Sequence, residues 1–101
     1  DTGVVEPETT TSSVRWSPNP FRGESAMMFT APLGTESAKC EIYDVSGRLA
    51  RSLTADADAR GLVAFTWDGR TNEGDDVAAG VFFARVATGE ETHETRLVVL
   101  K

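Results

Sequence analysis

The sequence has a single cysteine and a single histidine among its 101 residues. One cysteine excludes an internal disulfide and a metal site built on several thiolates. Cys40 falls in an alternating apolar row with Ala38 and Ile42, so we expect a small buried core residue and not a reactive thiol. A serine–histidine–aspartate triad would have to use His93. This residue lies in the polar stretch 90–94, which favours a surface position on a strand.

Long hydrophobic runs are also absent. No apolar stretch approaches the ~20 residues that a transmembrane helix requires, so no membrane span is expected. The chain starts at Asp1 without a basic and apolar leader, which indicates a mature chain or a piece of a longer one. With 40% hydrophobic and 26% charged residues, the 101-residue length suits one small domain with one core.

Basic residues are few, with 10 Lys and Arg against 16 Asp and Glu and a formal net charge of −6. Recognition of nucleic acid or anionic lipid needs clustered cations. The arginines are instead spread along the chain among acids, which is typical of a solvated surface. We therefore expect no nucleic-acid partner, and the charge balance is accounted for by solubility.

The composition divides the chain into two parts. Residues 1–12 are rich in threonine and acid, and only Val4 and Val5 offer apolar surface, so we expect a linker. Residues 13–101 are expected to form one folded domain. Short strand-like runs separated by turn residues predict an all-β, antiparallel sandwich of about seven strands. The runs cover residues 13–17, 25–31, 38–44, 48–53, 61–67, 81–86 and 93–100.

Alternating apolar residues predict which faces of these strands are buried. We expect inward rows at Met27, Phe29 and Ala31, at Ala38, Cys40 and Ile42, and at Val63, Phe65 and Trp67. Residues 81–86 are apolar on both faces, which favours a central strand. The large core volume is expected from Trp67, Phe65, Phe29, Phe83 and Ile42. Residues 54–60, rich in Asp and Ala, are expected to form a loop, with a single helical turn as the alternative.

The stretch 67–83 is the most informative part of the sequence. A polar, glycine-spaced loop separates two apolar strands, and it carries neither a catalytic set nor a complete ligand set. Asp68, Asn72 and Gly74 depart from the calcium-loop pattern at its third position and in the glycine spacing. An acid–base pair or a calcium site among its acids is therefore less favoured than turn capping. We expect no metal and no cofactor here, and an architectural corner instead.

Four motifs occur in a recognisable order. They are Ser17-Pro18-Asn19-Pro20-Phe21, Ile42-Tyr43-Asp44-Val45-Ser46-Gly47-Arg48-Leu49, Trp67-Asp68-Gly69 to Gly74 followed by Gly80-Val81-Phe82-Phe83, and Arg96 to Lys101. In order and spacing they resemble the Ig-like domain of flagellar hook-capping proteins. They equally resemble the type A C-terminal sorting domains carried by cargo of the type IX secretion system. The resemblance covers residues 14–101, with mild departures at Phe82, Thr71 and Arg96.

The structural signature of the resemblance consists of Pro18, Asn19, Pro20, Phe21, Tyr43, Asp44, Gly47, Arg48, Trp67, Asp68, Gly69 and Gly74. Pro18 and Pro20 lack N–H donors, so the entering strand can cross between the sheets without offering an edge. Gly47 and Gly69 are candidates for a positive φ at tight turns. Gly74 and Gly80 are candidates for letting the long loop fold back closely.

The resemblance implies an Ig-like antiparallel β-sandwich without enzymatic activity. It further implies a C-terminal sorting and anchoring domain of a larger bacterial protein that is secreted or held at the cell surface after passing the periplasm. The expected linker before the domain and the end of the chain directly after its last strand favour this interpretation. The partner would be the type IX machinery. The residues expected to be recognised are Gly80, Val81, Phe82, Arg96, Leu97 and Lys101.

Two other classes stay open. A structural Ig-like spacer, or an assembly subunit of a cap or fibre, would pair strands with neighbouring subunits, and residues 1–12 could supply the added strand. The domain would then be a monomer or a weakly self-associating protein. A carbohydrate-binding module has little support, because Trp16 and Trp67 form no obvious planar pair and Trp67 is assigned to the core.

Overall fold

A computed structural model of the protein describes residues 15–89 and 91–101. The expected linker 1–12, with Val4 and Val5, lies outside the described residues. Seven strands are present: β1 (Trp16–Ser17), β2 (Ser25–Thr30), β3 (Ser37–Asp44), β4 (Leu49–Asp56), β5 (Leu62–Trp67), β6 (Gly80–Ala87) and β7 (Thr92–Val99). No helix in the described part is long and apolar enough to cross a membrane.

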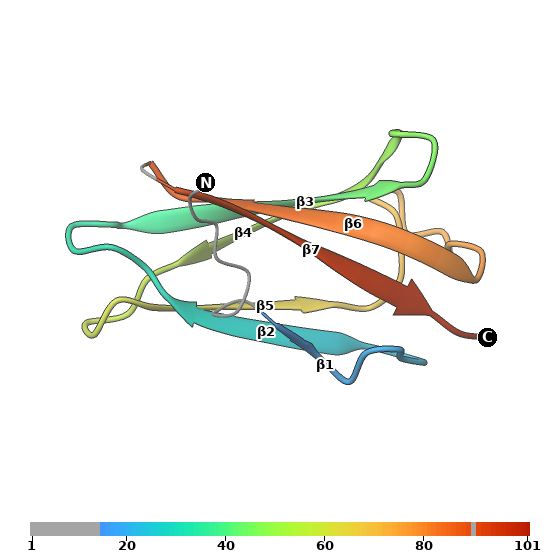
Figure 1. The fold of residues 1–101 in the computed structure, drawn as a ribbon, viewed down its shortest axis with the longest axis horizontal. Helices are drawn as coiled ribbons and strands as arrows, with labels where there is room; N and C mark the ends of the chain where they lie inside the picture. Colours follow the sequence, from blue (N-terminus) through green and yellow to red (C-terminus); the bar gives the residue numbers. More distant parts are fainter. Residues whose placement is uncertain (1–14, 90) are drawn as a thin grey trace, which may run out of the picture.

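The strands form two antiparallel sheets that lie face to face (Figure 1). One sheet has three strands in the order β1-β2-β5, and the other has four in the order β4-β3-β6-β7. The expected all-β, Ig-like sandwich of seven strands is therefore confirmed. β6 lies between β3 and β7, as the two-sided apolar pattern of residues 81–86 predicts.

The core fills the space between the sheets with alternate side chains from nearly every strand. In β5 the buried side chains are Val63, Phe65 and Trp67, while their neighbours in the strand face solvent or lie at its edge. The inward rows of β2 and β3 follow the predicted alternation, and Cys40 is fully buried. Burial is also the first cause that raises the pKa of the Cys40 thiol to about 12, so this thiol is inert at neutral pH.

Two side chains lie on the opposite face from the one expected. Phe83 was assigned to the core but is 46% exposed, because the inward positions of β6 are Phe82, Ala84 and Val86. His93 was expected at the surface but is only 7% exposed, since it shares the inward side of β7 with Leu97. In both cases the period of two along the strand decides the face, whatever the polarity of the neighbouring residues.

The boundary of β4 also differs from the expectation. Residues 54–56 belong to the strand and not to a loop or a helical turn, since Asp56 pairs with Ser37 and Thr54 pairs with Lys39. Ala55 and Ala57 are partly buried and pack against the core. Alternating alanines are therefore enough to fill the inward positions at this end of the strand, although their small size gives a weak apolar pattern in the sequence.

The segment 18–21 carries the chain from one sheet to the other, as the two prolines predict. Both peptide bonds that precede Pro18 and Pro20 are cis. β1 pairs with β2 in the three-stranded sheet, whereas Phe21 pairs in parallel with Val99 at the end of β7 in the four-stranded sheet. The entering strand therefore joins both layers at this edge of the sandwich.

Candidate functional site at one end of the sandwich

The four motifs of the sequence meet at one end of the sandwich, the end at which β5 stops and β6 begins. Trp67 lies at its centre and is fully buried. Its ring contacts Phe21 and Phe82 edge to face, with centroids 5.8 and 5.4 Å apart. Its indole Nε1 donates a hydrogen bond to the Arg70 carbonyl at 2.9 Å. Trp67 thus ties the segment 18–21, the corner after β5 and the start of β6 into one packed unit.

The loop after Trp67 is a hydrogen-bonded corner, as expected. Asp68 Oδ1 accepts the Arg70 N–H at 3.1 Å and the Arg51 guanidinium at 3.2 Å. The Gly69 carbonyl accepts the Val77 N–H at 3.0 Å. Arg70 and Asp76 form an ion pair at 3.4 Å across the loop. Asp68 therefore caps a turn and pairs with Arg51, and Asp76 pairs with Arg70, which is the kind of role that the sequence favoured for the acids of this loop.

Three of the glycines show why the turns need this residue. Gly47 and Gly69 have φ values of 90° and 76°, a region that side-chain-bearing residues adopt at a cost, so this prediction is confirmed. Gly74 also has a positive φ of 93°. No heavy atom comes close to the position of an added Cβ at Gly74 or Gly80. The close approach that we expected of these two is therefore absent, and Gly74 serves the backbone conformation alone.

The turn between β3 and β4 is organised by Asp44. Its Oδ1 accepts hydrogen bonds from the Ser46 N–H at 2.9 Å, the Ser46 hydroxyl at 2.6 Å and the Arg48 N–H at 3.0 Å. The hydrogen bond from Ser46 is the first cause that lowers the pKa of this carboxyl below its usual 3.8, and the Arg48 N–H is the second. Nearby, the hydrogen bond from the Tyr43 hydroxyl to Glu41 raises the pKa of Tyr43.

The six residues expected to be recognised lie at this same end. In the β6–β7 ladder, Gly80 pairs with Val99, Val81 with Val98, and Phe82 with Leu97. The side chains of Phe82 and Leu97 point into the core and are 6% and 0% exposed. A partner can therefore contact Gly80, Val81, Arg96 and Lys101 directly. Phe82 and Leu97 are buried beneath them and support the surface from inside the core.

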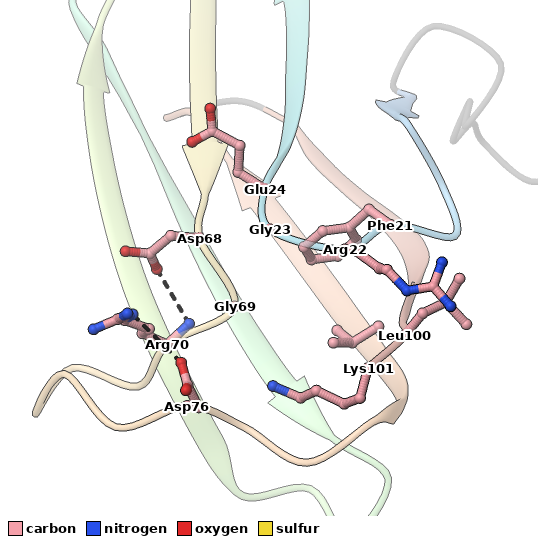
Figure 2. Close-up of a pocket in the computed structure, with 11 residues that line it drawn as sticks. Phe21, Arg22, Gly23, Glu24, Asp68, Gly69, Arg70, Asp76, Leu100 and Lys101 are labelled. Carbon is pink, nitrogen blue, oxygen red and sulfur yellow. Dashed lines mark hydrogen bonds and ion pairs between the residues drawn. The ribbon is translucent and has the colours of Figure 1, made fainter.

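A pocket of about 560 Å³ opens beside the end of β7 (Figure 2). Figure 2 shows Asp68, Arg70 and Asp76 on one side, with Arg22 and Lys101 on the other. Charges of both signs line it, and Arg70 is already paired with Asp76. The full lining is Phe21, Arg22, Gly23, Glu24, Asp68, Gly69, Arg70, Asp76, Val99, Leu100 and Lys101.

A second hollow, of about 420 Å³, lies between the β3–β4 turn and the loop that precedes β6. It is more apolar than the first, and Val45 and Leu49 on its rim are 74% and 42% exposed. Gly80 and Val81 belong to its wall. Three of the residues expected to be recognised, Gly80, Val81 and Phe82, therefore line a concave apolar surface.

The described residues contain no group of three or more His, Cys, Asp or Glu side chains that could hold a metal ion. His93 is held inside the sandwich, with its ring 5.8 Å from that of Phe29 and its Nε2 2.9 Å from Glu91 Oε1. Trp16 is buried as well, and its Nε1 donates to Thr95 Oγ1 at 3.0 Å. Neither tryptophan therefore offers a flat exposed face for stacking on a sugar.

The arrangement as a whole defines a small Ig-like β-sandwich whose signature residues build one end of the fold. The model of the FlgD Ig-like domain family matches residues 14–91, so the chain belongs to this family. No curated protein matches the sequence significantly.

The solved structures that share the fold include PorU, PorZ and FlgD. Dimeric latent PorU from Porphyromonas gingivalis superposes with a TM-score of 0.72 at 23% identity, covering 86% of this chain and 9% of that one. PorZ, a bacterial surface component of the type IX secretion system of Porphyromonas gingivalis, has a TM-score of 0.61 at 22% identity, covering 89% of this chain and 12% of that one. FlgD from Xanthomonas campestris, a hook-capping protein, has a TM-score of 0.61 at 24% identity, covering 87% of this chain and 62% of that one. The chain thus spans a small part of PorU and PorZ.

Two asparagines acquire a role that the sequence alone did not reveal. Asn19 and Asn72 were seen as parts of motifs, yet each side chain bonds to the backbone of an outer strand of the four-stranded sheet. An asparagine beside a proline pair or in a glycine-spaced loop is the only signal in the sequence. The strands that these side chains meet are 77 to 79 and 20 residues away, which no local pattern specifies.

Proposed function

We propose that this domain is a non-catalytic sorting and anchoring domain of a larger secreted bacterial protein, recognised by the type IX secretion machinery. The observation that carries the proposal is the meeting of all four motifs at one end of the sandwich, around Trp67. The exposed Arg96 and Lys101 lie there beside the β6–β7 ladder. The similarity to PorZ, itself a surface component of that system, supports the same setting.

Recognition would use the surface at this end and not a catalytic centre. Three of the acids that could serve in an acid–base pair, Asp44, Asp68 and Asp76, are engaged in turn caps or ion pairs. The accessible groups are two cations and the apolar rim of the hollow beside Gly80 and Val81. A protein partner with an apolar projection and nearby acids fits this surface best. The route through the periplasm to the cell surface or the medium belongs to the same proposal.

The experiment is an export assay with a reporter. Residues 1–101 are fused to the C-terminus of a periplasm-targeted reporter in a bacterium with the type IX machinery, and the reporter is followed in the surface and medium fractions. Removing residues 97–101 would also remove the buried Leu97 and Val99, so surface changes are the sharper test. We use the double charge reversal Arg96→Glu and Lys101→Glu, which leaves the core intact.

A matched control carries the same change in charge at the other end of the domain. Lys39→Glu with Arg60→Glu alters two exposed cations far from the motifs, and the Lys39–Glu41 ion pair at 3.5 Å is a surface pair of small energy. The proposal predicts that export is lost with the first pair of substitutions and kept with the second. Equal export from both double variants would contradict recognition at this end.

The alternative is a structural Ig-like spacer, or an assembly subunit of a cap or fibre that acts through β-strand pairing. The similarity to the hook-capping protein FlgD from Xanthomonas campestris favours this candidate. A folded reporter that stays in the periplasm with every fusion would favour it over the sorting role. The deletion of residues 1–12 would then be tested for the loss of concentration-dependent oligomers.

A further inference from the structure

The four-stranded sheet has two outer strands, β4 and β7, and each presents one edge to which no further strand of the sheet is paired. Such an edge is a row of N–H and C=O groups that can accept a strand from another molecule. In an antiparallel strand these groups point outward at every second residue. The outward residues are even-numbered in both strands, because Ser52 and Val98 bond away from their sheet partners.

On β7 the segment 19–21 covers the edge from residue 96 to residue 100. Asn19 Nδ2 donates to the Arg96 carbonyl at 2.8 Å, and Asn19 Oδ1 accepts the Val98 N–H at 3.0 Å. The Phe21 backbone continues the same row, with its N–H on the Val98 carbonyl at 3.0 Å and its carbonyl on the Leu100 N–H at 2.8 Å. Phe21 is 2% exposed and packs on Trp67, so this cover is anchored in the core.

On β4 the edge is closed by one residue of the exposed corner after β5. The Asn72 N–H donates to the Ala50 carbonyl at 3.0 Å, and Asn72 Oδ1 accepts the Ser52 N–H at 3.0 Å. One residue thus supplies the donor and the acceptor that a neighbouring strand would supply. Asn72 is exposed, and so are Glu73 and Gly74 beside it. Moving this cover aside disturbs no buried side chain.

We propose that Asn72 is an edge guard, which keeps the β4 edge from pairing with the β4 strand of a second copy of this chain. The next outward peptide groups, at Thr54 and Asp56, make no hydrogen bond with any other described residue. An antiparallel pairing centred on Leu53 puts Ser52 opposite Thr54 and Ala50 opposite Asp56. In this register the outward peptide groups of one copy lie opposite the outward peptide groups of the other, and no side chains of like charge lie opposite each other. The edge is self-complementary once Asn72 is displaced.

Asn72→Ala removes the acceptor of the Ser52 N–H and leaves the strand itself unchanged. The matched control is Asn72→Asp, which keeps Oδ1 in place. Thr54→Pro in the Asn72→Ala background removes an outward N–H and blocks strand addition, and this N–H takes no part in the ladder with β3. The mass of each variant is measured by light scattering over a wide range of concentrations. Amide hydrogen exchange reports on the edge residue by residue.

The expected results form one pattern. The natural chain and Asn72→Asp stay monomeric, Asn72→Ala forms dimers as its concentration rises, and adding Thr54→Pro restores the monomer. In dilute Asn72→Ala the Ser52 amide exchanges about five- to tenfold faster than in the natural chain, since one hydrogen bond is lost. A folded Asn72→Ala chain that stays monomeric throughout overturns the proposal. A dimer that survives Thr54→Pro also overturns it, because the copies would then join elsewhere.

The natural chain alone supplies a second test that needs no substitution. In dilute solution the Ser52 amide, which Asn72 covers, is expected to exchange far more slowly than the Thr54 amide, which has no cover. Equal protection of the two amides would refute the guard even if the Asn72→Ala chain failed to fold. These measurements test the role of Asn72 at the β4 edge and do not depend on whether the domain acts as a sorting signal.

Discussion

Replacing Trp67 with alanine is the perturbation that tests the packing of the functional end most severely. The ring is fully buried and contacts Phe21 and Phe82, so its removal leaves a large cavity between the two sheets. Removal of a buried tryptophan typically costs ~3–5 kcal/mol. The indole N–H bond to the Arg70 carbonyl is lost as well.

The lost ring contacts and the lost indole hydrogen bond place the expected loss of stability at the upper end of that range. Each edge-to-face ring pair adds about 0.5–1.5 kcal/mol beyond the area that it buries. The Arg70 carbonyl keeps the Arg51 guanidinium at 3.2 Å as a donor, so the lost indole bond adds about 1 kcal/mol or less. Small domains are stable by about 5–15 kcal/mol, so we expect Trp67→Ala to remove much of the stability of the fold.

The assay is urea unfolding at equilibrium, followed by far-UV circular dichroism because the substitution removes a fluorescent reporter. Phe83→Ser is the matched control, since Phe83 is an aromatic residue of β6, in the facing sheet, that is 46% exposed. We expect this control to cost about 1 kcal/mol or less. A loss below about 1.5 kcal/mol for Trp67→Ala would refute the role of Trp67 as the centre of this end.

Three further predictions concern single residues. The lowered pKa of Asp44 means that its charged form stabilises the fold above the usual pKa of 3.8, and that this contribution is lost as the pH falls through the lowered pKa. Asp44→Asn should therefore be less stable than the natural chain at neutral pH, and urea titrations should show this difference shrinking as the pH falls through the lowered pKa; a constant difference would contradict this. Cys40, with its pKa raised to about 12, should not react with a thiol reagent at pH 8 until urea unfolds the chain, and rapid native labelling would disprove its burial. Gly69→Ala should cost about 1–2 kcal/mol in thermal unfolding, because Gly69 has a φ of 76°, whereas an unchanged midpoint would show that the turn tolerates a side chain.

The sequence was sufficient to predict those elements whose side chains alternate clearly. The inward rows of β2, β3 and β5 are strongly apolar, so the pattern alone locates the strands and their buried faces. The turn glycines Gly47 and Gly69 were also predictable, because a tight turn between strands demands a positive φ.

Other features depend on weaker or longer-range information. The sequence predicts a loop at residues 54–56 because alanine and aspartate give little apolar contrast, although an alanine suffices at the edge of a core. The predictions for His93 and Phe83 are wrong because strand period, and not residue polarity, decides which face a side chain takes. His93 lies four residues before Leu97, so the two side chains share the inward face of β7. Phe83 directly follows the inward Phe82, so its side chain takes the opposite face of β6. The edge contacts of Asn19 and Asn72 join segments distant in sequence, and only the assembled sheets reveal them.

The central claim is that this domain directs a protein through the type IX machinery by the end of the sandwich where its motifs meet. The most direct measurement compares export of the reporter fused to residues 1–101 in a strain that has the machinery and in a matched strain that lacks it. The account predicts reporter at the surface or in the medium only where the machinery is present, and retention when Arg96 and Lys101 are reversed in charge. A folded fusion that stays in the periplasm of both strains would contradict it.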